Sequence, residues 1–194
     1  FDAFERVIAD FQHLYDASPH RAACDPHPAY FSSRYARSLG IPVVEVQHHY
    51  AHVLSCMADN HLEPPVLGVS WDGTGYGPDG SIWGGEFLKV GNGSFDRAAH
   101  LRTFLLPGGD KAIREPWRIA LAWLHALEIE WSDDLAPVKY AASLRNQTIP
   151  PLEALHAQLE KHLNAPATSS MGRLFDAAAA LVGLRQVVNY EAQA

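Results

Sequence analysis

The stretch over residues 66–90, VLGVSWDGTGYGPDGSIWGGEFLKV, constrains the fold of this chain more than any other. An apolar run ends in Asp72, and the chain becomes apolar again at Ile82. The loop between them is rich in glycine, with Gly73, Gly75, Gly77 and Gly80. Two apolar segments on either side of a glycine-rich loop predict a strand, a tight turn and a returning strand.

This loop also predicts a ligand site. Glycine lets backbone N–H groups approach an anion without interference from a Cβ atom. A carboxylate at a strand end, here Asp72, can hold a cation that bridges to phosphate oxygens. The residues therefore indicate a site for a phosphate-bearing ligand and a metal. The alternative is a long β-hairpin whose glycines only allow the chain to turn.

A second motif lies upstream, in the segment QHHYAH over residues 47–52. If this segment is helical, His48 and His52 lie on one face about one turn apart. That geometry suits two imidazoles on one divalent metal, and with Asp72 the set suits zinc or ferrous iron. The alternative is a histidine-rich helix start in which the rings have ordinary packing roles.

Composition excludes several classes of protein. The chain has 194 residues, which fits one domain or parts of two, and its formal charge of −7 argues against a nucleic-acid-binding surface. Cys24 and Cys56 do not make a disulfide framework, so we expect a reducing, cytoplasmic compartment and two cysteines in the core. No apolar run approaches the roughly 18 residues of a membrane span. The first residues contain acidic side chains and no initiator methionine, which indicates an excised piece without a signal peptide.

Hydrophobic periodicity predicts the order of elements along the chain. Helices are expected over residues 1–15, 30–39, 48–60, 115–127, 151–163 and 171–181. Strands are expected over residues 21–24, 41–46, 66–71, 82–90 and 95–106. The stretch 131–148 is mixed and receives no assignment. Strands dominate the first half and helices the second, which indicates an α/β lobe followed by a helical insertion.

Five separated motifs occur in a fixed order: VQHHYAH, DGTGYGPDGSIWGGEF, HLRTFLLPGGDKAIREPW, TSSMGRLFDAAAALVG and NYEAQA. With these motifs the chain resembles the hydrogenase maturation carbamoyltransferase family HypF, from the string CDPHPAYFSSRYA to its end. It also resembles, more distantly, the tRNA threonylcarbamoyl transferase family. The strings WGGEF and PGGD favour the hydrogenase pathway over the tRNA enzymes.

The resemblance implies an α/β fold of the actin-like, sugar-kinase-like ATP-binding superfamily, with a nucleotide between two lobes. We expect residues 1–62 to end the first lobe and residues 63–194 to begin the second. A helical insertion is expected over about residues 114–183. Because the family's later glycine-rich motif lies beyond Ala194, the cleft is expected to be incomplete.

The resemblance also implies a reaction. Members of the family form carbamoyl adenylate from carbamoyl phosphate and ATP, and transfer the carbamoyl group to the C-terminal cysteine of a HypE partner. Such an acceptor supplies the nucleophile, so no catalytic residue is assigned in this chain, and neither nucleic acid nor a membrane is expected as a partner. Residues matching the family's metal and nucleotide motifs are His48, His52, Asp72, Gly73, Thr74, Gly75 and Asp176.

Other functions fit the sequence less well. A zinc protease motif HExxH requires glutamate at position 49, where His49 stands. A calcium loop beginning at Asp72 fails because its twelfth position is Trp83. One departure from the family is Ala192, where the family usually has glycine. A tRNA-modifying transferase and a truncated, non-catalytic partner-binding remnant stay open as alternatives.

Overall fold

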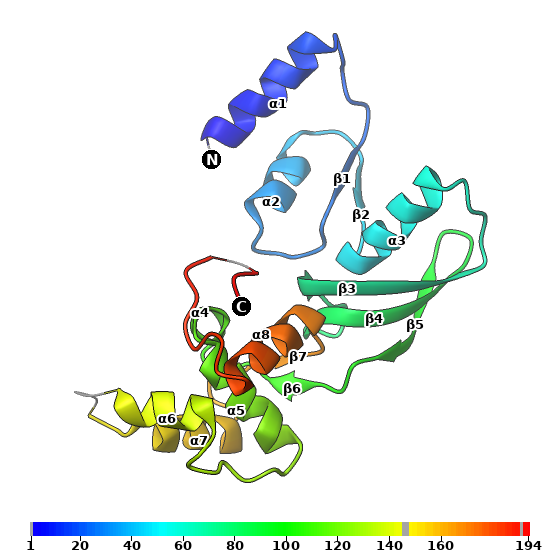
Figure 1. The fold of residues 1–194 in the computed structure, drawn as a ribbon. Helices are drawn as coiled ribbons and strands as arrows, with labels where there is room; N and C mark the ends of the chain where they lie inside the picture. Colours follow the sequence, from blue (N-terminus) through cyan, green and yellow to red (C-terminus); the bar gives the residue numbers. More distant parts are fainter. Residues whose placement is uncertain (1, 145–147, 191) are drawn as a thin grey trace.

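The structure is a computed structural model that describes residues 2–144, 148–190 and 192–194, and it contains both helices and strands (Figure 1). The helices are α1 (Asp2–Leu14), α2 (Phe31–Ser38), α3 (His48–Asp59), α4 (Asp110–Arg114), α5 (Pro116–Ala126), α6 (Ala136–Ser143), α7 (Pro151–Glu160) and α8 (Met171–Leu181). The strands are β1 (Ala22–Cys24), β2 (Val43–Glu45), β3 (Val66–Tyr76), β4 (Ile82–Val90), β5 (Phe95–His100), β6 (Phe104–Leu105) and β7 (Ala167–Thr168).

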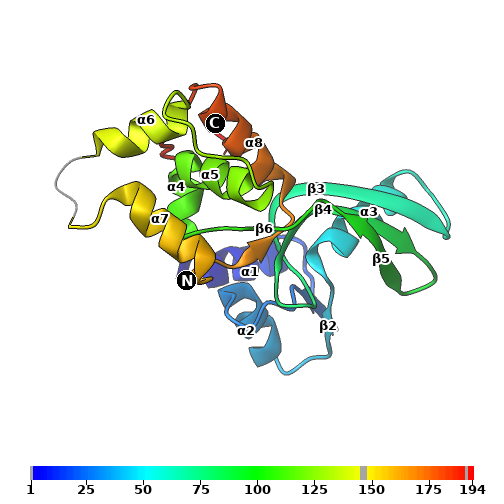
Figure 2. The same ribbon diagram turned by 90° about the horizontal axis from the view of Figure 1, so that it is seen from below.

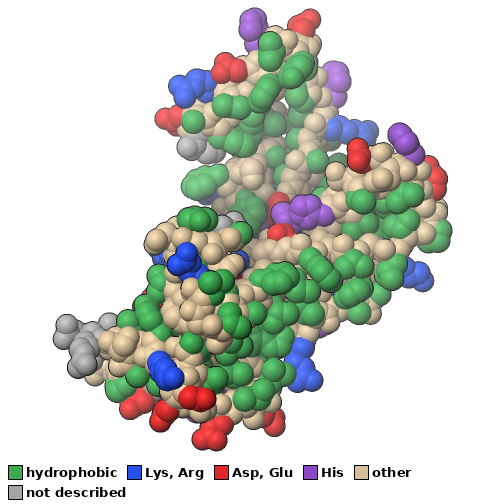
Figure 3. Space-filling view, viewed as in Figure 1, with side chains coloured by type: hydrophobic (Ala, Val, Ile, Leu, Met, Phe, Trp, Pro, Cys, Tyr) green, Lys and Arg blue, Asp and Glu red, His purple; other side chains and the backbone are tan. Residues whose placement is uncertain are grey.

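The N-terminal region is built from α1, α2 and a small parallel sheet of β1 and β2. The apolar residues of α1 repeat at helical spacing, so the predicted helix forms, yet none of its described residues is buried. Phe4, Phe11 and Leu14 are exposed, and hydrophobic side chains gather along this helix in Figure 3. Periodicity therefore predicts the helix correctly but does not show what covers its apolar side.

The main sheet runs in the order β3-β4-β7-β6, with β5 also paired to β4. Helix α3 packs against β3 at Gly68, where a Cβ atom would lie 2.4 Å from Val53 Cγ2. This contact belongs to a small core that also contains Met57, Leu88 and Val90. Leu67, Val69 and Trp71, on the opposite face of β3 from Gly68, are exposed, and β3 is an edge strand among the described residues.

The β3–β4 hairpin differs from the sequence prediction in where its first strand ends. β3 continues to Tyr76, and its pairing shifts between Trp71, opposite Gly85, and Gly75, opposite Trp83. The segment 72–74 therefore opposes a single residue of β4 and forms a bulge inside the strand. The prediction that the strand ends at residue 71 is wrong, because a glycine-rich segment favours a bulge as readily as a turn.

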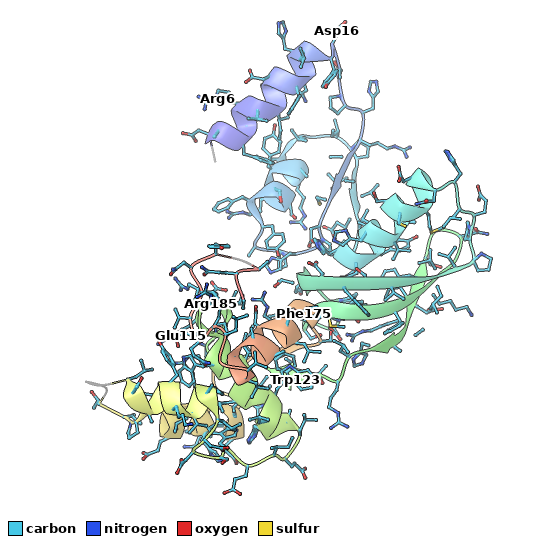
Figure 4. All side chains as sticks on the ribbon, viewed as in Figure 1. Arg6, Asp16, Glu115, Trp123, Phe175 and Arg185 are labelled. Atoms are coloured by element: carbon cyan, nitrogen blue, oxygen red, sulfur yellow. The ribbon has the colours of Figure 1, made fainter. Side chains whose placement is uncertain are left out.

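Helices α4 to α8 form a second core at one end of the sheet (Figure 2). Trp117, Ile119 and Leu121 of α5 are fully buried there. Helices α5 and α8 lie side by side, and Figure 4 labels Trp123 on the first and Phe175 on the second. Strand β7 returns the chain from α7 to the sheet, where it pairs with β4 and β6. The division into lobes and the insertion over about residues 114–183 stay predictions.

A buried charge network joins the strands to the segment before α8. Glu86 is fully buried, and its carboxylate accepts hydrogen bonds from Arg97 Nε at 2.6 Å and Ser169 Oγ at 2.5 Å. The backbone N–H groups of Gly84 and Gly85 donate to the same carboxylate. Burial alone would raise the pKa of Glu86, but these donors outweigh it and the pKa is lowered. Glu86 is therefore held as a carboxylate.

Most predicted helices are confirmed, and α8 has the predicted bounds. Ser170 is the N-cap of α8, since its hydroxyl accepts a hydrogen bond from the Arg173 N–H at 3.1 Å. The unassigned stretch 131–148 contains α6, while residues 145–147 lie outside the described part of the chain. The expectation of core cysteines is wrong for Cys56, which is exposed, whereas Cys24 is partly buried. No helix of the described residues is long and apolar enough to cross a membrane.

Candidate metal centre

The two spaced histidines lie at the start of α3, as the sequence predicts. The Gln47 side chain caps this helix by accepting a hydrogen bond from the Tyr50 N–H at 2.9 Å. The cap starts the helix at His48, which places His48 and His52 one turn apart. Their Nε2 atoms lie 3.2 Å from each other. Both rings therefore point their distal nitrogens at one position.

Asp72 completes this group from the bulge of β3. Its Oδ1 accepts a hydrogen bond from the Gly73 N–H at 2.6 Å, which fixes the carboxylate. Its Oδ2 lies 2.9 Å from His48 Nε2 and 3.9 Å from His52 Nε2. One ligand atom from each of the three residues lies within 4.8 Å of the others. Figure 3 shows histidine and acidic side chains together where the N-terminal region meets the sheet.

The buried polar atoms of this group fit a bound cation. Asp72 Oδ2 is buried and has no hydrogen-bond partner among the described residues, although imidazole nitrogens lie on several sides of it. His49 Nε2, 3.7 Å from the same oxygen, is also buried without a hydrogen bond in the described structure. A buried carboxylate oxygen without hydrogen bonds is costly unless a charge or a donor compensates it. His48, His52 and Asp72 therefore fit a divalent metal.

His49 supports this group as a neutral imidazole. It is fully buried, and burial lowers its pKa to about 4, with the neighbouring His48 acting in the same direction and Asp72 opposing it. Gln47 Nε2 lies 3.1 Å from His49 Nδ1, and it also donates to the Tyr76 carbonyl. A neutral ring adds no positive charge that would compete with a metal. Sequence reasoning treated His49 only as the residue that excludes a protease motif.

Asp25 is a second carboxylate that the sequence analysis missed. Its Oδ2 lies 3.4 Å from His48 Nδ1, on the opposite side of the ring from Asp72. Its Oδ1 accepts a hydrogen bond from the His27 N–H at 2.8 Å, which orients the carboxylate. A carboxylate behind a metal-binding histidine fixes the ring and strengthens it as a ligand. The available signal was that Asp25 follows β1, whose parallel neighbour β2 leads directly into α3.

Aromatic rings form one wall beside these carboxylates. His27 stacks on Tyr30 with ring centroids 4.0 Å apart and meets Tyr76 edge-on at 4.9 Å. Burial raises the pKa of Tyr30, and the charges of Asp25 and Asp72 raise it further. A cavity of about 340 Å³ lies along His48 and Asp25 on the N-terminal side. The group is thus accessible from a cavity.

The predicted glycine-rich loop is held by tight contacts. Gly75 is buried, and a Cβ atom there would lie 2.3 Å from His49 Cε1. Glycine at this position is therefore explained by the packing of the histidine helix. Thr74 is exposed, and its hydroxyl donates to the Gly73 carbonyl at 2.6 Å. The assignment of Gly73, Thr74 and Gly75 to phosphate binding stays a prediction.

Helix α8 begins directly against the bulge. Ser170 Oγ lies 3.1 Å from the Asp72 carbonyl oxygen and 2.8 Å from that of Gly73. Gly172 allows this approach, since a Cβ atom there would lie 2.8 Å from Gly73 Cα. The positive end of the helix dipole therefore lies beside the metal group, an arrangement that favours an anion.

Asp176 lies further along α8 and is nearly buried. Its Oδ2 is 3.1 Å from Arg173 Nε. Among the described residues it is not a member of the group formed by His48, His52 and Asp72. Its assignment to a nucleoside contact stays a prediction.

Ala192 adopts a backbone conformation that favours glycine, with a φ of 59°. The resembled family usually has glycine at this position, and glycine carries no steric cost there. The preceding residue of the NYEAQA motif, Glu191, lies outside the described part of the chain.

Comparisons with known proteins agree on one family. A family profile described as "Carbamoyltransferase, Kae1-like Domain, second subdomain" matches residues 68–194, and one described as "HypF Kae1-like domain" matches residues 1–59. The chain is 43% identical to the Carbamoyltransferase HypF of a Synechocystis strain and 44% identical to that of Rhizobium leguminosarum bv. viciae. These matches cover 100% and 98% of the chain, but 26% and 24% of those proteins. The chain thus spans about a quarter of the length of these curated relatives.

A solved structure supports the same fold. The crystal structure of full-length HypF in the phosphate- and nucleotide-bound form superposes with a TM-score of 0.85 at 39% identity, covering 100% of this chain and 24% of that one. The match confirms the expected α/β fold class.

Proposed function

This chain belongs to the HypF carbamoyltransferase family, and we propose that it forms the part of such an enzyme that transfers a carbamoyl group to a cysteine thiol. The donor would be carbamoyl adenylate, made elsewhere from carbamoyl phosphate and ATP. The acceptor would be the C-terminal cysteine of a HypE-like protein in hydrogenase maturation. The matched family favours this reaction over the modification of tRNA.

One observation carries the proposal: the buried Oδ2 of Asp72 makes no hydrogen bond in the described structure while the Nε2 atoms of His48 and His52 face it. These three residues would hold a divalent transition metal, either zinc or iron. When bound, such an ion supplies positive charge to a developing oxyanion and to a departing phosphate.

The chain's own residues would orient the donor. The bulge at residues 72–74 presents backbone groups beside the N-terminus of α8, where a phosphate group is electrostatically favoured. Asp25 would hold the His48 ring in place, and the rings of Tyr30 and Tyr76 pack against His27. The relative whose crystal structure carries phosphate and nucleotide has the same fold over the whole of this chain.

The thiol that attacks the carbamoyl carbon would come from the acceptor protein. Neither Cys24 nor Cys56 belongs to a candidate metal-ligand group of the described residues. Attack by an acceptor thiolate would form a carbon–sulfur bond and release AMP from the adenylate. The competing hypothesis is that this chain only docks the acceptor, without catalysis.

The test uses a full-length HypF in which this sequence replaces the equivalent segment. With labelled carbamoyl phosphate, ATP and a HypE-like acceptor, we expect Asp72→Asn to abolish transfer of label to the acceptor cysteine. Binding of the acceptor, measured by calorimetry, should be unchanged. Asp96→Asn in β5 is a matched control and should leave transfer intact. Equal transfer by wild type and Asp72→Asn would support the docking hypothesis instead.

Metal content tests the same site independently. We expect the isolated chain to bind about one divalent ion at His48, His52 and Asp72, and the variant with both His48→Ala and His52→Ala to lose the ion from that site. Binding there should weaken in mild acid, because a protonated imidazole cannot coordinate a metal. Retention of the same affinity in the double variant would contradict the assignment.

A further inference from the structure

A second cluster of metal-binding side chains lies in the helical region. His125, His156 and Glu160 each offer a ligand atom, and these atoms lie within 4.8 Å of one another. None of the three belongs to the motifs that carry the family resemblance. The cluster lies at the surface of the core formed by α4 to α8. The buried residues of that core are different from those of the core around α3.

The positions of these side chains follow from two packed helices. His125 lies in the last turn of α5, while His156 and Glu160 lie four residues apart on α7. Leu155 and Leu159 each precede a cluster residue by one position, about 100° away around α7, and are buried in the core that α5 shares. That packing turns His156 and Glu160 toward the end of α5. The two imidazole rings lie with centroids 5.8 Å apart at an interplanar angle of 80°.

The surroundings of the cluster favour a cation. A cavity of about 530 Å³ opens onto it, and its lining includes Glu128 and Glu130 in addition to the three cluster residues. The described lining contains no lysine or arginine, so carboxylates dominate its charge. Trp131 forms an apolar wall and lies edge-on to His156, with centroids 5.8 Å apart. A cation bound here would keep an open position toward the cavity.

We propose that His125, His156 and Glu160 bind a divalent transition metal of the zinc class. Two imidazoles and one carboxylate with an open position are a typical ligand set for zinc. Calcium and magnesium are disfavoured, because they prefer sites made entirely of oxygen. The ion would join the C-terminal end of α5 to α7, and this binding does not depend on the carbamoyl-transfer proposal.

The experiment measures Zn²⁺ binding by competition with a chromogenic chelator at pH 7.5. The background is the 194-residue chain carrying His48→Ala and His52→Ala, which removes the first candidate site. We expect this background to bind about one Zn²⁺ and to unfold at a higher temperature when Zn²⁺ is present. With Co²⁺ instead, it should show the absorption of a tetrahedral or five-coordinate ion.

Variants of the cluster locate the ion. In that background, His156→Ala and Glu160→Gln should each weaken Zn²⁺ binding by at least the roughly 10- to 100-fold typical of changes around a metal site. His13→Ala, an exposed histidine of α1, is the matched control and should change nothing. Circular dichroism reports whether each variant folds. If His156→Ala does not fold, Glu160→Gln still tests the site.

Two results would overturn the proposal. One is a background protein that binds no Zn²⁺ at concentrations where wild type binds it. The other is equal Zn²⁺ affinity in the background, His156→Ala and Glu160→Gln proteins. Neither result contradicts the site at Asp72 or carbamoyl transfer, so failure here is distinct from failure of the proposed function.

Discussion

The buried carboxylate of Glu86 provides a quantitative test of how this fold is stabilised. We consider the substitution Glu86→Gln, which preserves the shape of the side chain and removes its charge. In the wild type the carboxylate accepts hydrogen bonds from Arg97, Ser169, Gly84 and Gly85. A glutamine amide would instead point its N–H group at one of these donors. Donor groups in the buried site would then lack an acceptor.

The expected loss of unfolding free energy follows from the burial of the Glu86–Arg97 ion pair. Glu86 is fully buried and the Arg97 side chain is 17% exposed. Breaking such a pair by changing one partner costs about 3–5 kcal/mol. Arg97 keeps Asp79 at 3.2 Å and Ser169 Oγ at 3.0 Å, so its charge is still partly compensated. We therefore expect the lower end, about 3 kcal/mol, which corresponds to roughly 6–12 °C in thermal midpoint for a chain of this length.

The assay is urea unfolding followed by tryptophan fluorescence, since the Arg97 guanidinium lies 4.0 Å from the Trp83 ring centroid. The matched control is Glu45→Gln, which breaks the Arg37–Glu45 ion pair. Those side chains are 38% and 49% exposed, so the control should lower the free energy of unfolding far less than Glu86→Gln. Equal losses of unfolding free energy in the two variants would refute the reasoning.

The pH dependence of the same variant has a definite sign. Because the folded protein holds the pKa of Glu86 below 4.5, the unfolded chain takes up this proton first as pH falls. The contribution of Glu86 to stability is therefore complete above about pH 5 and is lost as pH falls through its lowered pKa. Glutamine does not titrate, so the difference between wild type and Glu86→Gln should shrink below about pH 4. A difference that grows in acid would contradict this assignment.

Three further changes test the metal centre and its support. Asp25→Asn should weaken metal binding by roughly 10- to 100-fold at unchanged stoichiometry, as measured by chelator competition, because it removes the carboxylate that orients a ligand histidine. Gly75→Ala should lower stability by about 1–3 kcal/mol in urea unfolding, because its methyl group meets the His49 ring, whereas Gly91→Ala, with no close contact, is the control. Ser170→Ala should cost about 1 kcal/mol by removing the N-cap of α8, and an unchanged unfolding midpoint would contradict that role.

Local sequence signals predicted those features that depend on neighbouring residues. The spacing of His48 and His52 predicted that both rings face one point, because helix geometry alone fixes it. Hydrophobic periodicity predicted the bounds of α8, and the structure confirms them with Ser170 as the N-cap and Gly183 in the left-handed region just after the helix. Caps and periodicity act over a few residues, so one sequence contains the information.

Contacts between distant segments could be identified only from the tertiary structure. The sequence placed Asp72 at a strand end, but only pairing with β4 shows a bulge that turns its Oδ2 toward the histidines. Asp25 reaches His48 because the parallel pairing of β1 with β2 puts the end of β1 beside the start of α3. No local pattern encodes such an approach, since it depends on which strands pair.

Burial shows the same contrast between what local sequence predicts and what tertiary contacts decide. No local pattern marks Glu86 in the sequence. Its buried network exists only because Arg97 of β5 and Ser169, in the segment before α8, both contact its carboxylate. Cys56 was expected in the core from residue type alone, yet its side of α3 faces solvent. By itself, the sequence determined most of the helices, the family motifs and the histidine pair. The tertiary structure decided which side chains are buried, charged and close together, because packing between distant segments sets their solvation and their partners.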